Sequence, residues 1–414
     1  MKIREKSWLE RKPIIEDLAY LERVAAILAD VRSRGDAALR EYSARFDRAE
    51  LAAFRISAEA IKAAYMQVPT DAIEALRVAA ARVEAFHRKQ PLTSWITHEL
   101  GGTLGQIVSP LDRVGVYVPG GTAPLPSSLL HAAIPAKVAG VKEIIVCTPP
   151  NPAAIVLVAA DIAGVSAVYQ VGGAQAVAAL AYGTESIPKV DKIVGPGNIY
   201  VVLAKKLVFG TVGIESLPGP TETVVVADEA ANPAWVAADL LAQAEHDVLA
   251  SAVLLTPSGS LAKAVQAEIA RRIEKLARAA IITQTFEAGS GIVLTDDVAE
   301  AVRLADAYAP EHLCLSVREP WAWVPEIHHA GGIFVGEHSF EVLGDYVAGP
   351  SHIMPTAGSA RFSSPVNVWD FVRLTSLIAL DAATTAQIAP AAALLAHAEG
   401  LDGHAGAAEE RTAA

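Results

Sequence analysis

The chain has 414 residues, of which 52% are hydrophobic and 19% are charged, so it can bury a large core and is not a disordered chain. Lysine and arginine total 34 against 46 aspartates and glutamates, and this net charge of −12 disfavours binding to a nucleic-acid backbone. Two cysteines cannot form a disulfide framework and indicate a reducing compartment. The length suggests two or three domains.

No targeting or membrane segment is expected. The basic start of the chain is not followed by an apolar run before residues 11–13. The longest apolar stretch, 153–171, is interrupted by Asp161 and Gly164. It is typical of a buried helix followed by a strand, because a membrane span needs about 20 uninterrupted apolar residues. We therefore expect a soluble, cytoplasmic protein.

The first ninety residues are predicted to be helical. One helix is expected over 36–46, with Gly35 as the break before it. A second is expected over 71–86, where apolar residues keep helical spacing. Asp71 can cap this helix, with Glu74 at its third position.

From about residue 106, short β-branched runs alternate with helical segments. Such alternation predicts parallel α/β sheets, in which ligands usually lie outside the carboxyl ends of the strands. The last fifty residues are predicted to return to helix, first over 368–380 and then over 389–399. The predicted strands are 114–118, 143–147, 167–171, 192–194, 223–227, 253–256, 312–316 and 333–335.

Glycine and proline cluster after several of these strands. Each cluster alone is typical of an ordinary turn, but four within about a hundred residues favour a cofactor crevice, since glycine lets the backbone approach a ligand closely. The G-x-G-x-x-G dinucleotide fingerprint is absent, so the motifs alone do not indicate NAD. The clusters are residues 118–124, 171–175, 194–198 and 217–221.

Polar residues form weak constellations. Gln243 and His246 are three residues apart, so on a helix they share one face and could hold a common ion. Asp345 lies in a glycine-flanked segment seven residues before His352, and the two converge only if that segment folds back. Taken alone, the first pair is typical of a solvated helix end and the second of an Asx-type turn.

Glu311 and His312 could supply two proton acceptors with different pKa values, with His312 accepting an alcohol proton and Glu311 activating water. Neighbouring residues on a strand point to opposite faces. Both therefore reach one site only at an irregular turn, which Pro310 allows. Glu399 and His404 lie near the chain end, and nothing local makes His404 a ligand.

Taken in this order, the segments resemble the histidinol dehydrogenase family from about residue 34 to His404. The resemblance implies two Rossmann-like parallel-sheet domains that lack the GxGxxG fingerprint, with helical N- and C-terminal segments. The implied boundaries are an N-terminal segment 1–12, a discontinuous first domain 13–116 plus 222–364, an NAD-binding domain 117–221 and a C-terminal segment 365–414. The most specific segments are 117–121, 172–176, 194–198, 243–246, 310–313 and 344–346.

The family oxidises L-histidinol through L-histidinaldehyde to L-histidine, the last step of histidine biosynthesis, with two NAD+ and one zinc ion per subunit. By resemblance, His312 is the base for the alcohol and hydrate protons and Glu311 activates the water. The implied zinc ligands, which also contact the substrate together with His312, are Gln243, His246, Asp345 and His404. Further substrate contacts are Thr221, His352 and Glu399, and the implied NAD contacts are Tyr117, Gln175 and Asn198.

The family is a homodimer in which the C-terminal segment completes the partner's site, so Glu399 and His404 are expected to act in trans. The sequence departs from the family at Thr221, where serine is usual, and at Ser351, where asparagine is common. Two other functions stay open. A paralogue could oxidise another small amino alcohol or diol, and a silent α/β protein could bind without catalysis. Retention of His352 and Glu399 favours histidinol oxidation over the paralogue. Retention of the whole ligand set argues against a silent protein.

Overall fold

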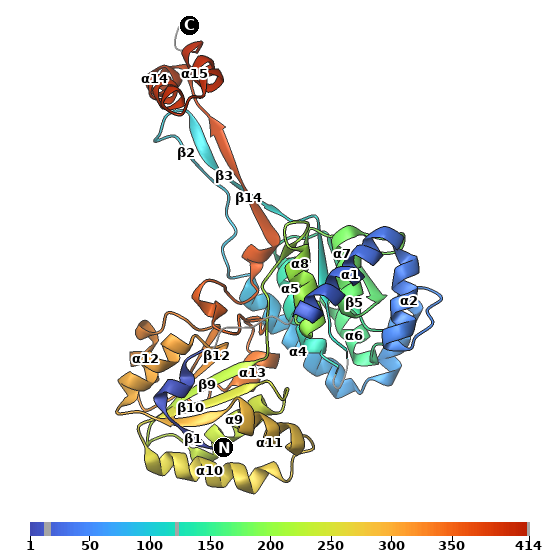
Figure 1. Ribbon diagram of the computed structural model, residues 1–414, viewed down its shortest axis with the longest axis vertical. Coiled ribbons are helices and arrows are strands. Elements are labelled where there is room, and N and C mark those ends of the chain that lie inside the picture. Colours follow the sequence, from blue (N-terminus) through green and yellow to red (C-terminus); the bar gives the residue numbers. More distant parts are fainter. Residues whose placement is uncertain (12–17, 121–123, 412–414) are drawn as a thin grey trace. The chain divides into compact units, whose positions relative to one another are not determined.

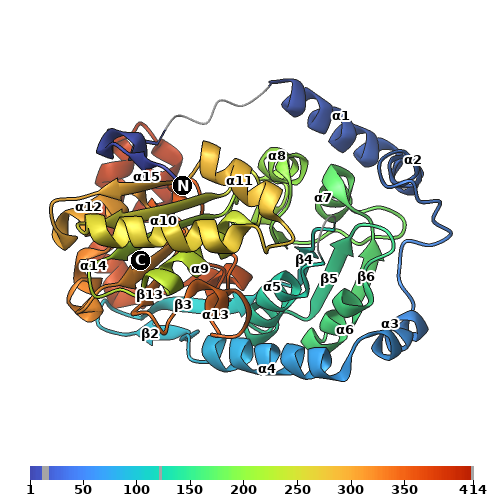
Figure 2. The same cartoon turned by 90° about the horizontal axis from the view of Figure 1, so that it is seen from below.

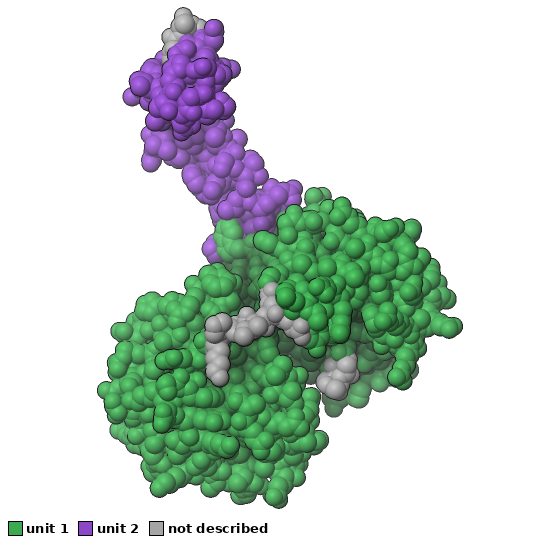
Figure 3. All heavy atoms as spheres, viewed as in Figure 1, with its two compact units in different colours: residues 1–90, 111–371 green, residues 91–110, 372–414 purple. Residues whose placement is uncertain are grey.

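The computed structural model describes residues 1–11, 18–120 and 124–411. The chain divides into two compact units (Figure 3). Unit 1 comprises residues 1–90 and 111–371, and unit 2 comprises residues 91–110 and 372–414.

The first sheet of unit 1, sheet A, has six parallel strands in the order β1-β11-β10-β9-β12-β13 (Figure 1). Every residue of β9, β10 and β12 is buried. Burial on both faces explains why these strands read as continuous apolar runs rather than as alternating patterns. The strands are β1 (Ile3–Arg4), β9 (Glu222–Ala227), β10 (Ser251–Thr256), β11 (Gly291–Leu294), β12 (His312–Ser316) and β13 (Gly332–Val335).

Helices cover both faces of sheet A. Val225 and Leu254 pack with α9, α10 and α11 on one face, whereas Val224 and Leu313 pack with α12 on the other. This alternation follows from the period of two along a strand. The helices are α9 (Pro233–Ala244), α10 (Gly259–Ile273), α11 (Ala279–Ala288), α12 (Val298–Tyr308) and α13 (Glu341–Tyr346), of which α13 contacts α9.

The second sheet, sheet B, has five parallel strands in the order β6-β5-β4-β7-β8. Its chain starts in the middle, adds two strands on one side and then crosses to the other, so β4 and β7 flank a topological switch point. Strands β9 to β13 of sheet A follow the same order. The strands are β4 (Arg113–Tyr117), β5 (Glu143–Thr148), β6 (Ala167–Gln170), β7 (Lys192–Val194) and β8 (Gly213–Ile214).

The helices before residue 90 pack against the sheet B layer. Helix α1 contacts α7 and α8, and α4 contacts α5 (Figure 2). The predicted grouping placed 13–116 with 222–364, whereas these helices and β4 pack with sheet B. The sequence of a helix shows which of its faces is apolar, but it does not show which sheet that face packs against. The helices are α1 (Leu18–Arg34), α2 (Asp36–Asp47), α3 (Ala58–Ala64), α4 (Thr70–His87), α5 (Pro126–Val138), α6 (Ala154–Ala163), α7 (Gly173–Tyr182) and α8 (Ile199–Val208).

Unit 2 is an antiparallel sheet in the order β14-β3-β2, followed by two helices that pack on each other. The prediction of a helix over 368–380 was wrong, because Val372–Ala379 forms strand β14, paired with β3 along its whole length. An eight-residue run of mixed apolar and polar residues fits either structure, and a partner strand far away in sequence decided this one. The elements are β2 (Trp95–Thr97), β3 (Thr103–Pro110), β14 (Val372–Ala379), α14 (Ala382–Ala398) and α15 (Asp402–Glu409).

The predicted α/β fold with parallel sheets is confirmed, and all eight predicted strands are present. The helices predicted over 36–46 and 71–86 are present too, but Pro69 rather than Asp71 occupies the cap position of α4. Asp71 lies in the first turn, where its carboxylate accepts from the Ala72 N–H at 2.8 Å. Short 3-10 helices are η1 (Lys6–Leu9), η2 (Tyr65–Gln67), η3 (Pro320–Ala322), η4 (Val324–Glu326), η5 (Ser359–Arg361) and η6 (Val368–Phe371).

Within the described ranges, none of the helices is both long enough and apolar enough to cross a membrane.

Helix α4 offers a matched pair of valines for testing its packing. Val83 is 0% exposed on the buried face of the helix, whereas Val78 is 53% exposed. We expect Val83→Ala to lower the free energy of unfolding by about 2 kcal/mol, because it removes buried methyl groups and leaves a cavity. Val78→Ala should change it by less than about 0.5 kcal/mol. Urea unfolding measures both, and equal effects would contradict the packing of α4 against α5.

Candidate active site

The predicted proton-transfer residues lie at the amino ends of the strands of sheet A. Glu222 pairs in register with Ser251, and Thr223 pairs with His312, so β9, β10 and β12 begin side by side. These predicted residues lie at the edge opposite the carboxyl ends, where ligands of such sheets are usually expected. The physical reason is that the polar side chains sit just before or at the start of these strands, in the segments that enter the sheet.

An irregular turn brings Glu311 and His312 together. Helix α12 ends at Tyr308, its C-cap Ala309 has a left-handed φ of 52°, and Pro310 follows. Glu311 precedes β12, whereas His312 is its first residue. Glu311 Oε2 lies 3.7 Å from His312 Nδ1, so the two neighbouring side chains face one site, as the sequence predicted for such a turn.

Glu311 is held by two donors. Thr221 Oγ1 donates to Glu311 Oε2 at 2.6 Å, and the Glu222 N–H donates to the same oxygen at 3.1 Å. Burial raises the pKa of the Glu311 carboxyl to about 7, while the charge of His312 and the two hydrogen bonds act to lower it. A carboxyl that titrates near neutrality is suited to exchange a proton with water.

His312 turns one ring nitrogen, Nε2, toward Asp345. Its Nδ1 lies 3.3 Å from the carbonyl oxygen of Glu222, so an Nδ1–H donates there and the lone pair is left on Nε2. Nε2 is buried without a hydrogen-bond partner among the described residues. It lies 3.7 Å from Asp345 Oδ1, which places the predicted base beside the predicted zinc ligand.

Glu341 is a site residue that the sequence analysis missed. Its side chain is buried, it accepts from Thr223 Oγ1, and its Oε1 lies 3.9 Å from His312 Nδ1. Burial and the neighbouring charge of Asp345 raise the pKa of the Glu341 carboxyl well above its usual range. The spacing in the sequence could have indicated this residue, because Glu341 and Asp345 are four residues apart on α13 and share one face.

The predicted zinc ligands of unit 1 come from α9 and α13, and they fit a cation. Gln243 is buried and its Nε2 donates to Thr221 Oγ1 at 3.1 Å, whereas His246 lies just past the helix end. Burial raises the pKa of the Asp345 carboxyl, and the charges of His312 and His246 lower it. No lysine or arginine forms an ion pair with Asp345 in the described part of the chain.

A mostly buried carboxylate whose ion-pair partner among the described residues is an imidazole is a suitable place for a metal ion. Of the described residues, no three histidine, cysteine, aspartate or glutamate side chains form a metal-holding group by themselves. The set in unit 1 includes the amide of Gln243, and it has only two members of those four types.

His352 links helix α5 to the backbone of Asp345. Its Nδ1 lies 2.7 Å from the Asp345 carbonyl oxygen, and its Nε2 lies 3.2 Å from Ser128 Oγ. Its ring stacks on His131 at 4.3 Å between centroids, and its backbone N–H donates to His131 Nδ1 at 3.0 Å. Burial lowers the pKa of His131 to about 4, so that ring is neutral at pH 7.

The predicted NAD contacts lie at the carboxyl edge of sheet B. Tyr117 ends β4, and its Oη accepts from the Gly173 N–H at 3.0 Å. Gln175 is buried in α7, and the Asn198 side chain caps α8 by accepting from two backbone N–H groups. Gly121 to Ala123, part of the first predicted glycine loop, lie outside the described residues.

The remaining predicted residues belong to unit 2. Glu399 is the C-cap of α14 and His404 lies in α15, and both are exposed.

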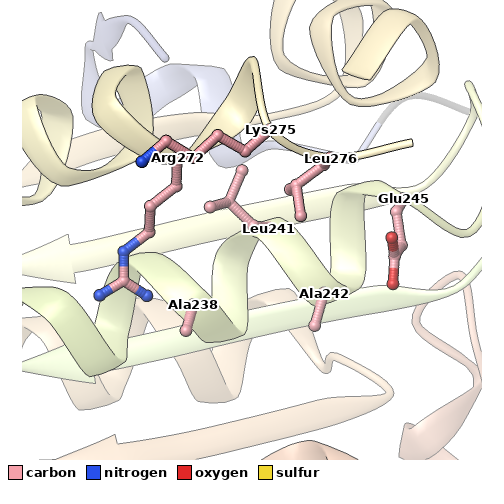
Figure 4. Close-up of a pocket in the computed structure, with 7 residues that line it drawn as sticks. All are labelled: Ala238, Leu241, Ala242, Glu245, Arg272, Lys275 and Leu276. Atoms are coloured by element: carbon pink, nitrogen blue, oxygen red, sulfur yellow. The ribbon is translucent and has the colours of Figure 1, made fainter. Parts of the chain in front are cut away.

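A hollow of about 330 Å³ lies between α9 and α10 (Figure 4). It opens on the face of α9 that carries Ala238, Leu241, Ala242 and Glu245. By helical spacing Gln243 lies on the opposite face, so this hollow is not the candidate site.

The comparisons with known proteins decide the family. A histidinol dehydrogenase family model matches residues 10–412. The chain belongs to the histidinol dehydrogenase family. It is 54% identical to the histidinol dehydrogenase of Deinococcus radiodurans over 404 residues, covering 96% of this chain and 92% of that protein. The histidinol dehydrogenase of Moorella thermoacetica is 52% identical over 396 residues, covering 94% and 93% respectively.

A solved structure agrees. The crystal structure of histidinol dehydrogenase from Elizabethkingia anophelis is 35% identical, with a TM-score of 0.93, and the match covers 98% of this chain and 95% of that chain. Membership of the histidinol dehydrogenase family makes the chain an oxidoreductase of amino-acid biosynthesis, and the family resemblance predicted from the sequence is confirmed.

The raised pKa of Glu311 predicts a pH-dependent stability. Between about pH 4.5 and 7 the folded chain holds a proton on Glu311 that the unfolded chain releases, so stability falls as the pH rises through this window. Glu311→Gln removes that dependence. Its unfolding free energy relative to wild type should therefore increase by about 2 kcal/mol between pH 5 and pH 8.

Urea unfolding at the two pH values measures this difference, with the exposed Glu74→Gln as a control. A Glu311→Gln difference that does not vary with pH would show that the carboxyl titrates as it does in water.

Proposed function

We propose that this chain is a histidinol dehydrogenase that oxidises L-histidinol through L-histidinaldehyde to L-histidine, the last step of histidine biosynthesis. The proposal includes two NAD+ per turnover and one zinc ion per subunit. The observation that carries it is the convergence of Glu311, His312 and Asp345 at one edge of sheet A, in a chain of this family. A base, a water-activating carboxyl and a cation ligand are what a two-step alcohol oxidation needs.

Zinc would be held by Gln243, His246 and Asp345, with His404 as the fourth ligand. When bound, zinc supplies Lewis acidity that attracts the imidazole and amine nitrogens of the substrate and so orients it. Thr221 holds Gln243 in place, because its hydroxyl accepts a hydrogen bond from the Gln243 amide and donates one to Glu311. One hydroxyl thus connects the metal-ligand side of the site to its proton-transfer side.

His312 acts in both oxidations. In the first, Nε2 accepts the hydroxyl proton of the alcohol while the carbon-bound hydrogen leaves as hydride. In the second, it accepts a hydroxyl proton of the aldehyde hydrate as the second hydride leaves, which gives the acid. The cofactor supplies the hydride-accepting chemistry, and each NAD+ takes one hydride. The bond from Nδ1–H to the Glu222 carbonyl keeps the lone pair on Nε2.

Glu311 acts between the two oxidations, when water adds to the aldehyde carbon. Its Oε2 is occupied by two donors, and its Oε1 has no hydrogen bond among the described residues and is left to accept a proton from the attacking water. Tyr117, Gln175 and Asn198 would contact NAD+ from the carboxyl edge of sheet B. His352 would contact the substrate, and its links to Ser128 and Asp345 hold it in place.

A homodimer with shared sites completes the proposal. Unit 2 exposes large apolar side chains that a second copy would cover, since isolated units rarely present so many to water. Glu399 and His404 of this unit would then complete the site of the partner subunit. The exposed apolar residues include Trp95, Ile96, Leu100, Ile107, Leu374, Ile378, Ile388, Leu394 and Leu395.

The stoichiometry of NADH tests the function. With limiting L-histidinol, we expect two NADH per substrate, because the aldehyde stays bound and its hydrate gives up the second hydride. A chelator should abolish the reaction and added zinc should restore it. One NADH would remove the proposed role of Glu311, and none from zinc-loaded protein would favour a paralogue that oxidises another small alcohol.

Mixed dimers test whether the sites are shared. His312→Asn removes the base that a subunit supplies to its own site, and His404→Asn removes the ligand that it supplies to its partner's site. Each variant alone should therefore be inactive. Random exchange of subunits should then recover about a quarter of wild-type activity, because half of the dimers are mixed and each mixed dimer holds one intact site. If both residues act within one chain, mixing restores nothing. Mixing two His312→Asn preparations is the control.

A further inference from the structure

A fully buried ion pair lies beneath the predicted cofactor loop 195–198. Lys205 of α8 and Glu215, which follows β8, have side chains that are 1% and 2% exposed, and Lys205 Nζ lies 2.7 Å from Glu215 Oε1. Neither residue belongs to the proton-transfer or metal-ligand set. Removing two charges from water is costly, and apolar residues of similar volume often give equal or greater stability. Stability therefore does not explain this pair.

Both members of the pair bind the same residue of the loop. Glu215 Oε1 accepts from the Gly195 N–H at 2.8 Å, and Lys205 Nζ donates to the Gly195 carbonyl oxygen at 3.2 Å. The pair thus holds the peptide groups on either side of the Gly195 α-carbon. Two peptide orientations fixed at one residue determine the path of the chain through it.

Gly195 needs such support. Its φ is +126°, which side chains rarely allow, and a Cβ there would lie 2.1 Å from the carbonyl oxygen of Tyr117. The backbone of the loop therefore lies directly against the last residue of β4. Three residues later, Asn198 caps the N-terminus of α8. Gly195 lies between two of the predicted NAD contacts, at the switch point between β4 and β7.

We infer that Lys205 and Glu215 are positioning residues for the dinucleotide: by holding both peptide groups of Gly195, they keep Tyr117, loop 195–198 and the start of α8 in one preformed surface. This inference rests on the proposed NAD dependence. A preformed surface spends less binding energy on ordering the loop. The pair touches neither the proton-transfer residues nor the predicted zinc ligands, so its effect is confined to the cofactor.

Two double variants separate this role from packing. Lys205→Met with Glu215→Leu replaces the pair by apolar side chains and removes both bonds to Gly195. Lys205→Met with Glu215→Gln keeps an acceptor for the Gly195 N–H and removes only the bond to the carbonyl. The control is Arg77→Met with Glu74→Gln, which removes an exposed ion pair on α4.

The readouts are NAD+ affinity by calorimetry without substrate, KM for NAD+ and for L-histidinol, kcat and the urea midpoint. For the Met/Leu variant we expect about a tenfold weaker NAD+ affinity and a KM for NAD+ raised to match, with kcat and the KM for L-histidinol within about twofold. The Met/Gln variant should bind NAD+ about two- to threefold more weakly than wild type, and the control should bind NAD+ as wild type does.

A folded Met/Leu variant that binds NAD+ as wild type does would overturn the inference, as would equal losses in both double variants. If the Met/Leu variant does not fold, the Met/Gln variant decides, and wild-type affinity in that variant counts against the inference. Failure of the proposed function would look different. Wild-type protein would then form no NADH from L-histidinol, while calorimetry would still report how the variants bind NAD+.

Discussion

The parallel register of β9, β10 and β12 is the constraint on which the candidate site depends. Because Glu222, Ser251 and His312 begin their strands side by side, the segments that enter sheet A meet at one edge. Thr221 and Glu311 are then close enough for a hydrogen bond, although 90 residues separate them in the chain. A slip of one residue in this pairing would turn His312 to the other face of the sheet and separate it from Asp345.

The site concentrates carboxyl groups in a place where burial opposes their charge. Glu311, Glu341 and Asp345 all have pKa values raised by burial, and they surround a single imidazole. Such an arrangement does not stabilise the folded chain by itself, because uncompensated buried carboxylates are costly. It suits a site that binds a cation and exchanges protons, since these groups find their partners only when the reaction components are present.

The two sheets share a strand order, but their predicted site residues lie at opposite edges: the carboxyl ends of the strands in sheet B and the amino ends in sheet A. In sheet B the predicted cofactor residues follow the usual rule and lie at the carboxyl ends, beside the switch point between β4 and β7. In sheet A the predicted proton-transfer side chains lie at the amino ends. Helix α5 carries Ser128 and His131, and these contact His352 and so connect the layer of sheet B to the backbone of Asp345.

The sequence by itself determined eight strands of the two parallel sheets, because short β-branched runs between helical segments favour strands, but it did not predict β1, β8 or β11. It also determined the family, through six motifs in order, and with it the candidate residues. The tertiary structure alone decided that 372–379 is a strand, that the first helices pack on sheet B, and that Glu341 stands beside His312. Each of these depends on a partner distant in the chain. Local patterns record which face of a segment is apolar, whereas pairing and long-range packing decide what that face meets.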